Sequence, residues 1–240
     1  LSMGFQSFDD KILKVLGRLH KSKDCFKTFK NARKAGFDNI NTDMIFNIPD
    51  LSIKNWIKDL NKLIELDPDH ISAYSLTIEP STALFNLVKN KRILMPNEKI
   101  DIEQFLTTKD ILLKNGYHQY EISNYSKKGM ECKHNLHYWN LSPYLSFGPS
   151  AHSYDIKKRW WNVRSLEKYT NYLEKGKLPI EDNEILSRKD NYNETILNGL
   201  RLSQGIKTSD LKEYSDIINK TEFNKVIDKW DCLSVSDNNI

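Results

Sequence analysis

Strand-like and helix-like segments alternate through the first half of the chain, and this alternation limits its fold more than any other feature. Apolar side chains recur at every second position in the strand-like segments and at helical spacing in the others. The strand-like segments are 1–8, 39–48, 70–78 and 118–125. Two helices begin at the predicted caps Ser22 and Ser52, and a third spans 98–115. Because parallel strands need a crossover helix, we expect parallel βαβ units.

Four strands and three helices amount to half of a (β/α) barrel. Such barrels carry their active sites at the C-terminal ends of the strands, so polar residues late in each strand are candidates. Taken singly, each is also explained as an ordinary rim or turn residue, and only the row as a whole favours a site. The row consists of Gln6, Asp43, Thr77, Glu79, Glu121 and Asn124.

The pattern changes from about residue 165, where short helices follow one another. We expect a helix capped by Ser165, another over 187–203, one capped by Thr208, and a last helix leading into a strand near the end. This order is typical of a small, mainly helical, winged-helix-like domain. Its final stretch mixes acids with bases and has no arginine-rich face for phosphate contact, so we expect a structural or partner-binding role.

Composition narrows the class of protein. Lys and Arg number 36 against 32 Asp and Glu, and the net charge of +4 is spread evenly, which argues against a nucleic-acid partner. Three cysteines about a hundred positions apart fit a reducing cytoplasm, and no apolar run could cross a bilayer. Neither end of the chain shows the cap or pairing strand that would close its element, so we expect it to begin and stop inside a larger fold.

The segment HNLHYW, His134 to Trp139, has three alternative readings. As a metal pair, the two histidines would need a helix, which Asn135 and the Tyr-Trp pair disfavour, while a strand would point them to opposite faces. Packed, hydrogen-bonded histidines are the simpler interpretation. The third is a wall for a large planar ligand, with Tyr138 and Trp139 stacking and one histidine offering a nitrogen to iron.

Three further residues have both a plain and a functional interpretation. His152 follows a predicted short strand and small residues in SFGPSAHSY, which either form a simple turn or let a ligand approach the backbone. Arg18 is either a surface cation or the partner of a ligand carboxylate or phosphate. Asp43 lies in a strand expected to be buried, where a carboxylate needs a partner, and ribose hydroxyls would suit it.

Five sequence blocks together resemble the radical S-adenosylmethionine (SAM) family of oxygen-independent coproporphyrinogen III oxidase and the heme chaperone HemW. The blocks are GFQSFDDKILKVLGRLH, NINTDMIFNIP, HISAYSLTIEP, YEISNYSKKGMECKHNLHYW and FGPSAHSY. The resemblance implies the C-terminal part of a partial, six-stranded (β/α) barrel and a small C-terminal domain. We expect the barrel over 1–126, a connecting region over 127–180 and a truncated C-terminal domain over 181–240.

The same resemblance implies roles for individual residues. Gln6, Arg18 and Asp43 match positions that contact SAM, and Thr77 and His152 align with further contacts whose surrounding motifs differ. The heme-handling block corresponds to His134, Asn135, His137, Tyr138 and Trp139. Where the family has glycines in the turn after the aspartate, this chain has FNIPD, with Asn47 and Asp50 in their place.

The implied function is heme binding and delivery to a hemoprotein, and HNLHYW favours it over the alternative, oxidative decarboxylation of coproporphyrinogen III. The family uses SAM and a 4Fe-4S cluster held by C-x-x-x-C-x-x-C, a motif that this sequence lacks. We therefore expect that this chain by itself neither assembles the cluster nor cleaves SAM. Whether it is an enzyme, whether it forms a dimer, and which histidine approaches the iron stay open.

Overall fold

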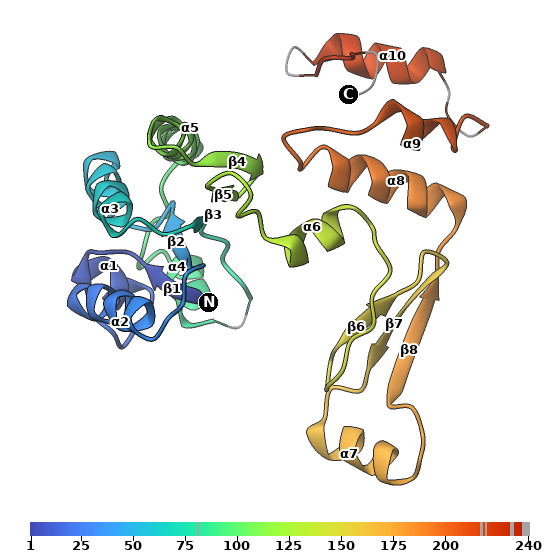
Figure 1. Cartoon of the computed structure of the whole chain (residues 1–240), viewed down its shortest axis with the longest axis horizontal. Helices are drawn as coiled ribbons and strands as arrows, with labels where there is room; N and C mark the ends of the chain where they lie inside the picture. Colours follow the sequence, from blue (N-terminus) through green and yellow to red (C-terminus); the bar gives the residue numbers. More distant parts are fainter. Residues whose placement is uncertain (81, 217, 219, 231–232, 237–240) are drawn as a thin grey trace. The chain divides into compact units, whose positions relative to one another are not determined.

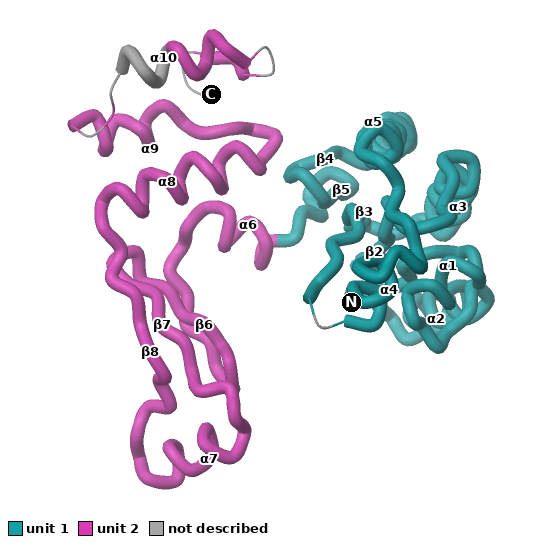
Figure 2. Tube along the Cα trace, turned by 180° about the vertical axis from the view of Figure 1, so that it is seen from behind, with its two compact units in different colours: residues 1–132 teal, residues 133–240 magenta. Residues whose placement is uncertain are grey.

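The computed structural model describes residues 1–80, 82–216, 218, 220–230 and 233–236. It divides the chain into two compact units, Leu1–Cys132 and Lys133–Ile240, which are coloured separately in Figure 2. The finer division of the chain at 126 and 180 stays a prediction.

The first unit is built on a five-stranded sheet with the order β1-β2-β3-β5-β4 (Figure 1). Its strands are β1 (Ser2–Gln6), β2 (Asn41–Phe46), β3 (His70–Ser75), β4 (His118–Glu121) and β5 (Asn124–Ser126). The first three strands run parallel, as predicted. The expected single fourth strand is wrong: residues 118–125 fold back at a two-residue turn, and β5 pairs antiparallel with both β3 and β4.

Helices α2 (Ser22–Lys34), α3 (Ile53–Leu66) and α5 (Glu98–Lys114) confirm the predicted periodicity, and α1 (Asp10–Val15) and α4 (Ala83–Lys89) join them. Ser52 caps α3 through its hydroxyl, as expected. Ser22 is not the cap of α2. Lys21 occupies that position, because the carboxylate of Asp24 accepts a hydrogen bond from its backbone N–H.

The core of this unit lies on one face of the sheet. In β2, Thr42, Met44 and Phe46 are buried while the residues between them are half-buried. Helices α3 and α5 pack against each other and contribute fully buried Trp56, whose indole donates to Thr108 Oγ1 at 2.8 Å. The opposite face of the sheet carries small and polar residues instead, several of them buried.

The second unit holds an antiparallel sheet, β6-β7-β8, followed by helices. The strands are β6 (His152–Tyr154), β7 (Lys158–Asn162) and β8 (Ile180–Ile185), and the helices are α6 (Lys133–Trp139), α7 (Leu166–Glu174), α8 (Arg188–Gly199), α9 (Thr208–Lys212) and α10 (Lys220–Lys229). Ser165 caps α7 as predicted, and α8 to α10 agree with a mainly helical C-terminal segment.

Several local expectations for this unit are wrong. The segment Tyr144 to Gly148 is no strand, and only Tyr144 forms an isolated bridge, to Tyr154. Lys207, not Thr208, precedes α9 as its cap. The strand expected after α10 is absent over 233–236, and its other residues lie outside the described part of the chain.

None of the helices in the described ranges combines the length and apolar character that a membrane span requires.

Asp59 ties α3 to the end of the first strand and supports a test of this unit's packing. Its Oδ2 accepts hydrogen bonds from Ser7 Oγ at 2.6 Å and from the Phe8 backbone N–H at 2.9 Å. Burial raises the pKa of the Asp59 carboxyl above its ordinary value of 3.8. The folded state therefore holds the carboxyl proton more tightly than the unfolded state. The free energy of unfolding falls as pH rises from the ordinary pKa of 3.8 through the raised pKa of the folded state.

We expect Asp59→Ala to lower the free energy of unfolding by about 2–5 kcal/mol, because it leaves two buried donors without an acceptor. Asp59→Asn keeps an acceptor oxygen without the charge, so it should cost less and flatten the fall in stability above pH 4. Urea unfolding at pH 4 and pH 7 measures both effects. Equal losses in the two variants would show that these hydrogen bonds do not stabilise the unit.

Candidate functional site

The face of the first sheet opposite the core carries two rows of small and polar residues. One row runs from Gly4 through Asp43 and Ser72 to Asn124, which are register partners on neighbouring strands. The other row consists of Ser2, Asn41, His70 and Ser126 in the same register. Because side chains alternate along a strand, these residues share the face opposite the core.

A chain of hydrogen bonds connects Asp43 to the far side of this face. Asn41 Nδ2 donates to Asp43 Oδ1 at 2.8 Å, while Asn41 Oδ1 lies 2.7 Å from His70 Nδ1. His70 Nε2 lies 2.7 Å from the hydroxyl of Tyr120. Burial lowers the pKa of His70 from 6.5 to about 4, so its ring is neutral at pH 7. Nδ1 therefore donates to Asn41, and Nε2 accepts from Tyr120.

Sequence reasoning missed Asn41, His70 and Tyr120. The first two carried a usable signal, since Asn41 precedes Asp43 by two positions on the same strand and His70 begins the next strand. The network holds the Asp43 carboxylate in a half-buried position by one side-chain donor, which leaves further lone pairs for a ligand.

Gln6 is brought close to the same row. It ends β1 with a left-handed backbone, φ 69°, and its side chain turns back over Gly4. A Cβ at position 4 would meet Gln6 Nε2 at 2.5 Å, so the glycine makes room for this amide. Gly4 is the register partner of Asp43, and the structure therefore brings two of the predicted SAM-contacting residues together.

The turn after β2 keeps the left-handed backbone for which glycine is suited. Asn47 and Asp50 have φ values of 59° and 64°. The Asn47 N–H donates to Gln104 Oε1 at 2.7 Å, and Gln104 Nε2 donates to the Leu51 carbonyl at 2.9 Å. This anchoring by α5 holds the strained conformation although neither residue is glycine.

The other predicted rim residues fall into two groups. Arg18, Thr77 and Glu79 are exposed in loops after α1 and β3. Glu121 and Asn124 are buried at the β4–β5 turn, where Glu121 Oε1 accepts hydrogen bonds from the Ser123 N–H and from Asn124 Nδ2. Their pairing has a structural role in the hairpin.

Two polar atoms of this face are left over: Asn124 Oδ1 and Ser126 Oγ are buried and have no hydrogen-bond partner within the described part of the chain. Asn124 Oδ1 lies on the row of Asp43, where a carboxylate and this carbonyl oxygen are both acceptors. The row therefore fits a ligand with hydroxyl and amino donors, and SAM carries both.

The cysteines offer no comparable fit for an iron-sulfur cluster. Cys25 is buried, and burial raises the pKa of its thiol to about 11, so it is protonated at neutral pH. Cys132 is half-buried and Cys232 lies outside the described residues. Within the ranges that the structure describes, no group of three or more His, Cys, Asp or Glu side chains could hold a metal ion.

In the second unit, HNLHYW forms helix α6, contrary to the expectation that its residues disfavour one. Packing overrides the weak local propensity. The guanidinium of Arg201 lies 4.2 Å from the centre of the Trp139 ring, and Tyr138 packs edge-to-face on Tyr144 with 4.7 Å between ring centres.

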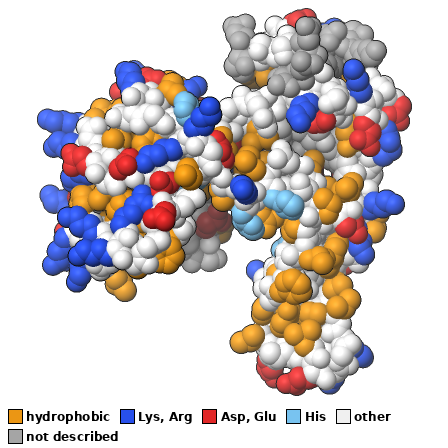
Figure 3. All heavy atoms as spheres, in the orientation of Figure 1, with side chains coloured by type: hydrophobic (Ala, Val, Ile, Leu, Met, Phe, Trp, Pro, Cys, Tyr) orange, Lys and Arg blue, Asp and Glu red, His pale blue; other side chains and the backbone are white. Residues whose placement is uncertain are grey.

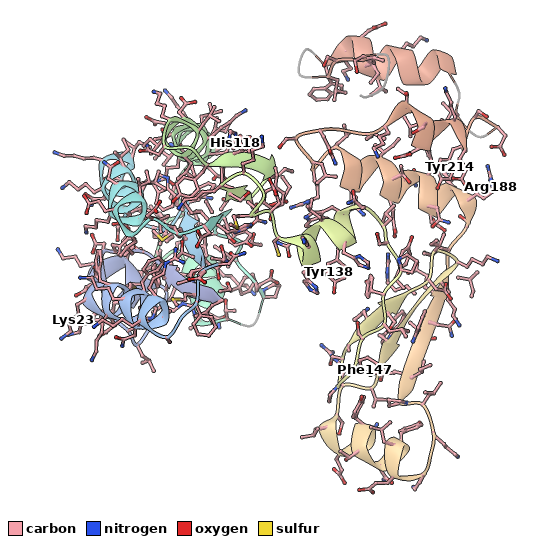
Figure 4. The ribbon with its side chains drawn as sticks, in the orientation of Figure 1. Lys23, His118, Tyr138, Phe147, Arg188 and Tyr214 are labelled. Carbon is pink, nitrogen blue, oxygen red and sulfur yellow. The ribbon has the colours of Figure 1, made fainter. Side chains whose placement is uncertain are left out.

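The two histidines of α6 are exposed, and Asn135 is half-buried. His134 packs edge-on against Tyr138 at 4.9 Å between ring centres, and His137 Nε2 lies 2.9 Å from the Pro143 carbonyl oxygen. These contacts agree with packed, hydrogen-bonded histidines. Figure 4 shows Tyr138 projecting from α6.

Two cavities of the second unit adjoin this helix and share Trp139, Leu141 and Tyr154. The smaller, of about 270 Å³, is lined mainly by aromatic rings: Tyr138, Trp139, Tyr144, His152 and Tyr154, with Leu141, Arg159 and Asn198. The larger, of about 450 Å³, extends to residues of α8 and α9. At the aromatic end of HNLHYW, Trp139 thus lines both cavities and Tyr138 lines the smaller one.

His152 is the one predicted SAM contact that belongs to the second unit. The other four, Gln6, Arg18, Asp43 and Thr77, belong to the first unit. The turn before it is held by two hydrogen bonds: the Gly148 N–H donates to the Tyr169 hydroxyl at 2.9 Å, and Asn162 Nδ2 donates to the Gly148 carbonyl at 3.0 Å. Gly148 has a φ of 106°, which the small residue permits. The role of His152 toward SAM stays a prediction.

Apolar side chains gather over β6 to β8 and α7 in Figure 3. The exposed apolar residues there include Phe147, Leu166, Leu178 and Ile185, each more than half exposed. Surfaces of this kind commonly contact an apolar ligand or a partner.

The neutral state of His70 gives a test of the polar network. A histidine with a lowered pKa in the folded state contributes stability above pH 6.5 that is lost as pH falls toward 4, on the order of 3 kcal/mol here. We expect His70→Gln to remove this part of the pH dependence of the free energy of unfolding, measured by urea denaturation between pH 4 and 7.5. The exposed His118→Gln is the matched control and should leave it unchanged. If the free energy of unfolding of His70→Gln depended on pH as steeply as that of the unaltered chain, the result would contradict the network.

Comparisons with known proteins extend these observations. The HemN C-terminal domain matches residues 186–229. Heme chaperone HemW of Bacillus subtilis (strain 168) is 37% identical over 206 residues, which cover 86% of this chain and 54% of the relative. Heme chaperone HemW of Buchnera aphidicola subsp. Schizaphis graminum is 31% identical over 232 residues, covering 95% of this chain and 60% of the relative. The chain thus spans about half the length of the curated relatives it matches.

A solved structure, described as coproporphyrinogen III oxidase (HemN) from Escherichia coli, a radical SAM enzyme, superposes with a TM-score of 0.73 over 93% of this chain and 54% of that chain, at 19% identity. This likeness confirms the expected fold, a part of a (β/α) barrel followed by a small C-terminal domain. The resemblance drawn from the five sequence blocks is confirmed as well. The chain is therefore similar over most of its length to members of the radical SAM family named heme chaperone HemW, and it shares its fold with coproporphyrinogen III oxidase HemN.

Proposed function

We propose that this chain is part of a heme chaperone, which binds heme and delivers it to a hemoprotein. The observation that carries the proposal is the aromatic cavity that Tyr138 and Trp139 of HNLHYW help to line. Relatives named heme chaperone HemW, 31–37% identical over 86% or more of this chain, support the same function.

The cavity suits the two chemical characters of a heme. Its tyrosine and tryptophan rings offer flat apolar surface to the macrocycle. Its polar side chains suit the propionates: burial raises the pKa of Tyr144 and Tyr154, so their hydroxyls stay protonated, and Arg159 adds a cation. Arg159 is itself held by Glu194, 2.9 Å from its Nη2, so a propionate would bind beside an existing ion pair.

We infer that the polar face of the first unit binds SAM. Asp43 would accept hydrogen bonds from the ribose hydroxyls, Gln6 lies beside it, and Arg18 and Thr77 are the further proposed contacts. A 4Fe-4S cluster, where bound, would supply an open iron site for the amino and carboxylate groups of SAM. No described cysteine of this chain is proposed as its ligand.

The proposed setting is the cytoplasm, since three widely spaced cysteines, of which Cys25 is a buried thiol, suit a reducing compartment. The evenly spread charge gives no support to a nucleic-acid partner, and a hemoprotein is the proposed acceptor.

Hemin titration tests the heme proposal. We expect the chain to give a saturable Soret change, and Tyr138→Ala to weaken hemin binding about tenfold or more, because it removes one wall of the cavity. Tyr172→Ala is the matched control, since Tyr172 lies on α7 and lines neither cavity. Equal weakening in both variants, or no saturable binding by the unaltered chain, would contradict the proposal.

Turnover of coproporphyrinogen III by the whole protein distinguishes the oxidase from the chaperone. We expect the whole protein with SAM, under anaerobic reduction, to bind heme and to leave coproporphyrinogen III unchanged. Porphyrin product analysis by chromatography measures this. Turnover of coproporphyrinogen III without stable heme binding would favour the oxidase.

A further inference from the structure

Three histidines of the second unit differ in what surrounds them. His137 is hydrogen-bonded to the Pro143 carbonyl, and His134 packs on the edge of Tyr138. Neither of these two lines either cavity beside α6, whereas His152 of β6 lines the smaller one together with Tyr138 and Trp139. The imidazole that reaches the aromatic cavity therefore comes from the sheet and not from the HNLHYW motif.

The ring of His152 is placed by stacking. It lies 5.6 Å from the ring of Trp161, at an angle of 26° between the planes, and Trp161 is its register partner on β7. In the described part of the chain, neither ring nitrogen of His152 makes a hydrogen bond. Stacking orients an imidazole by its faces and leaves the nitrogens at its edge available to a ligand.

His152 is also exposed, so it stands where the cavity opens. Behind it, the rings of Tyr144 and Tyr154 continue the aromatic wall, with 5.9 Å between their centres. A cavity of about 270 Å³ lies just below the usual range for sites that bury a drug-sized ligand. It would hold one edge of a porphyrin and leave the remainder accessible, which suits a protein that must release its ligand.

We infer that His152 is the axial ligand to the iron of a bound heme, with one edge of the macrocycle in the Tyr138–Tyr154 cavity. This inference rests on the proposed function and assigns the iron contact to β6. A ring nitrogen donates its lone pair to ferric iron and a water ligand leaves, so no electron is transferred. The alternative implied by the resemblance, contact with SAM, would place no nitrogen on iron.

Spectra of the hemin complex test this assignment in the 240-residue chain. We expect the unaltered chain to show the Soret maximum and electron paramagnetic resonance signal of imidazole-bound iron. His152→Gly should lose both and bind hemin about tenfold more weakly or worse. Free imidazole added to His152→Gly should restore the spectrum, because the vacated position can admit it. His118→Ala, which alters an exposed histidine of the first unit, is the matched control.

Each outcome decides the inference. Loss in His152→Gly with rescue by imidazole supports it, and circular dichroism of the variant checks that the unit is folded. An unchanged spectrum in His152→Gly overturns it, as does loss of the imidazole signal in His134→Ala or His137→Ala while His152→Gly retains it. Saturable hemin binding by the unaltered chain without an imidazole signal overturns only the assignment of His152. Absence of hemin binding would instead refute the proposed function itself.

Discussion

The alternation of side chains along β2 divides the first unit into a core and a polar face. Met44 and Phe46 are buried with the helices, while Asn41 and Asp43 point to the other side of the sheet. Because this period is two, a shift of one residue would exchange the two faces. The parallel pairing of β2 with β1 and β3 then extends both faces across the sheet. The strand that stabilises the fold therefore also places Asp43, one of the proposed SAM-binding residues.

The hydrogen bonds of the polar face depend on a neutral histidine, His70. A carboxylate such as Asp43 in a half-buried position costs free energy unless it is hydrogen-bonded, and Asn41 supplies that bond. Asn41 is in turn oriented by His70, whose burial keeps it uncharged and therefore able to donate through one nitrogen and accept through the other. The face combines oriented acceptors with unused lone pairs, which is what a ligand rich in hydroxyl and amino groups needs.

In the second unit, helix α6, which carries HNLHYW, is too short to be stable alone. Seven residues of α6 give few backbone hydrogen bonds, and isolated helices of this length are marginal in water. Arg201 over Trp139 and the Tyr138–Tyr144 contact hold it in place. Arg201 lies within the segment that matches the HemN C-terminal domain, so that domain and HNLHYW form one structure. Figure 4 shows the same domain tied internally by Arg188, whose guanidinium lies over the ring of Tyr214.

The sequence by itself determined the strands β1 to β3, the helices α2, α3 and α5, and the family resemblance, because periodicity and motif order are local properties of the chain. It did not determine that residues 118–125 form a hairpin, since a turn of two residues reverses the strand and the apolar pattern reads the same in either direction. Nor did it determine helix α6, which depends on packing from Arg201. Only the tertiary structure decided which polar residues meet. Asn41 and His70 are 29 positions apart, and Tyr138 and His152 belong to different elements, so no local pattern could pair them.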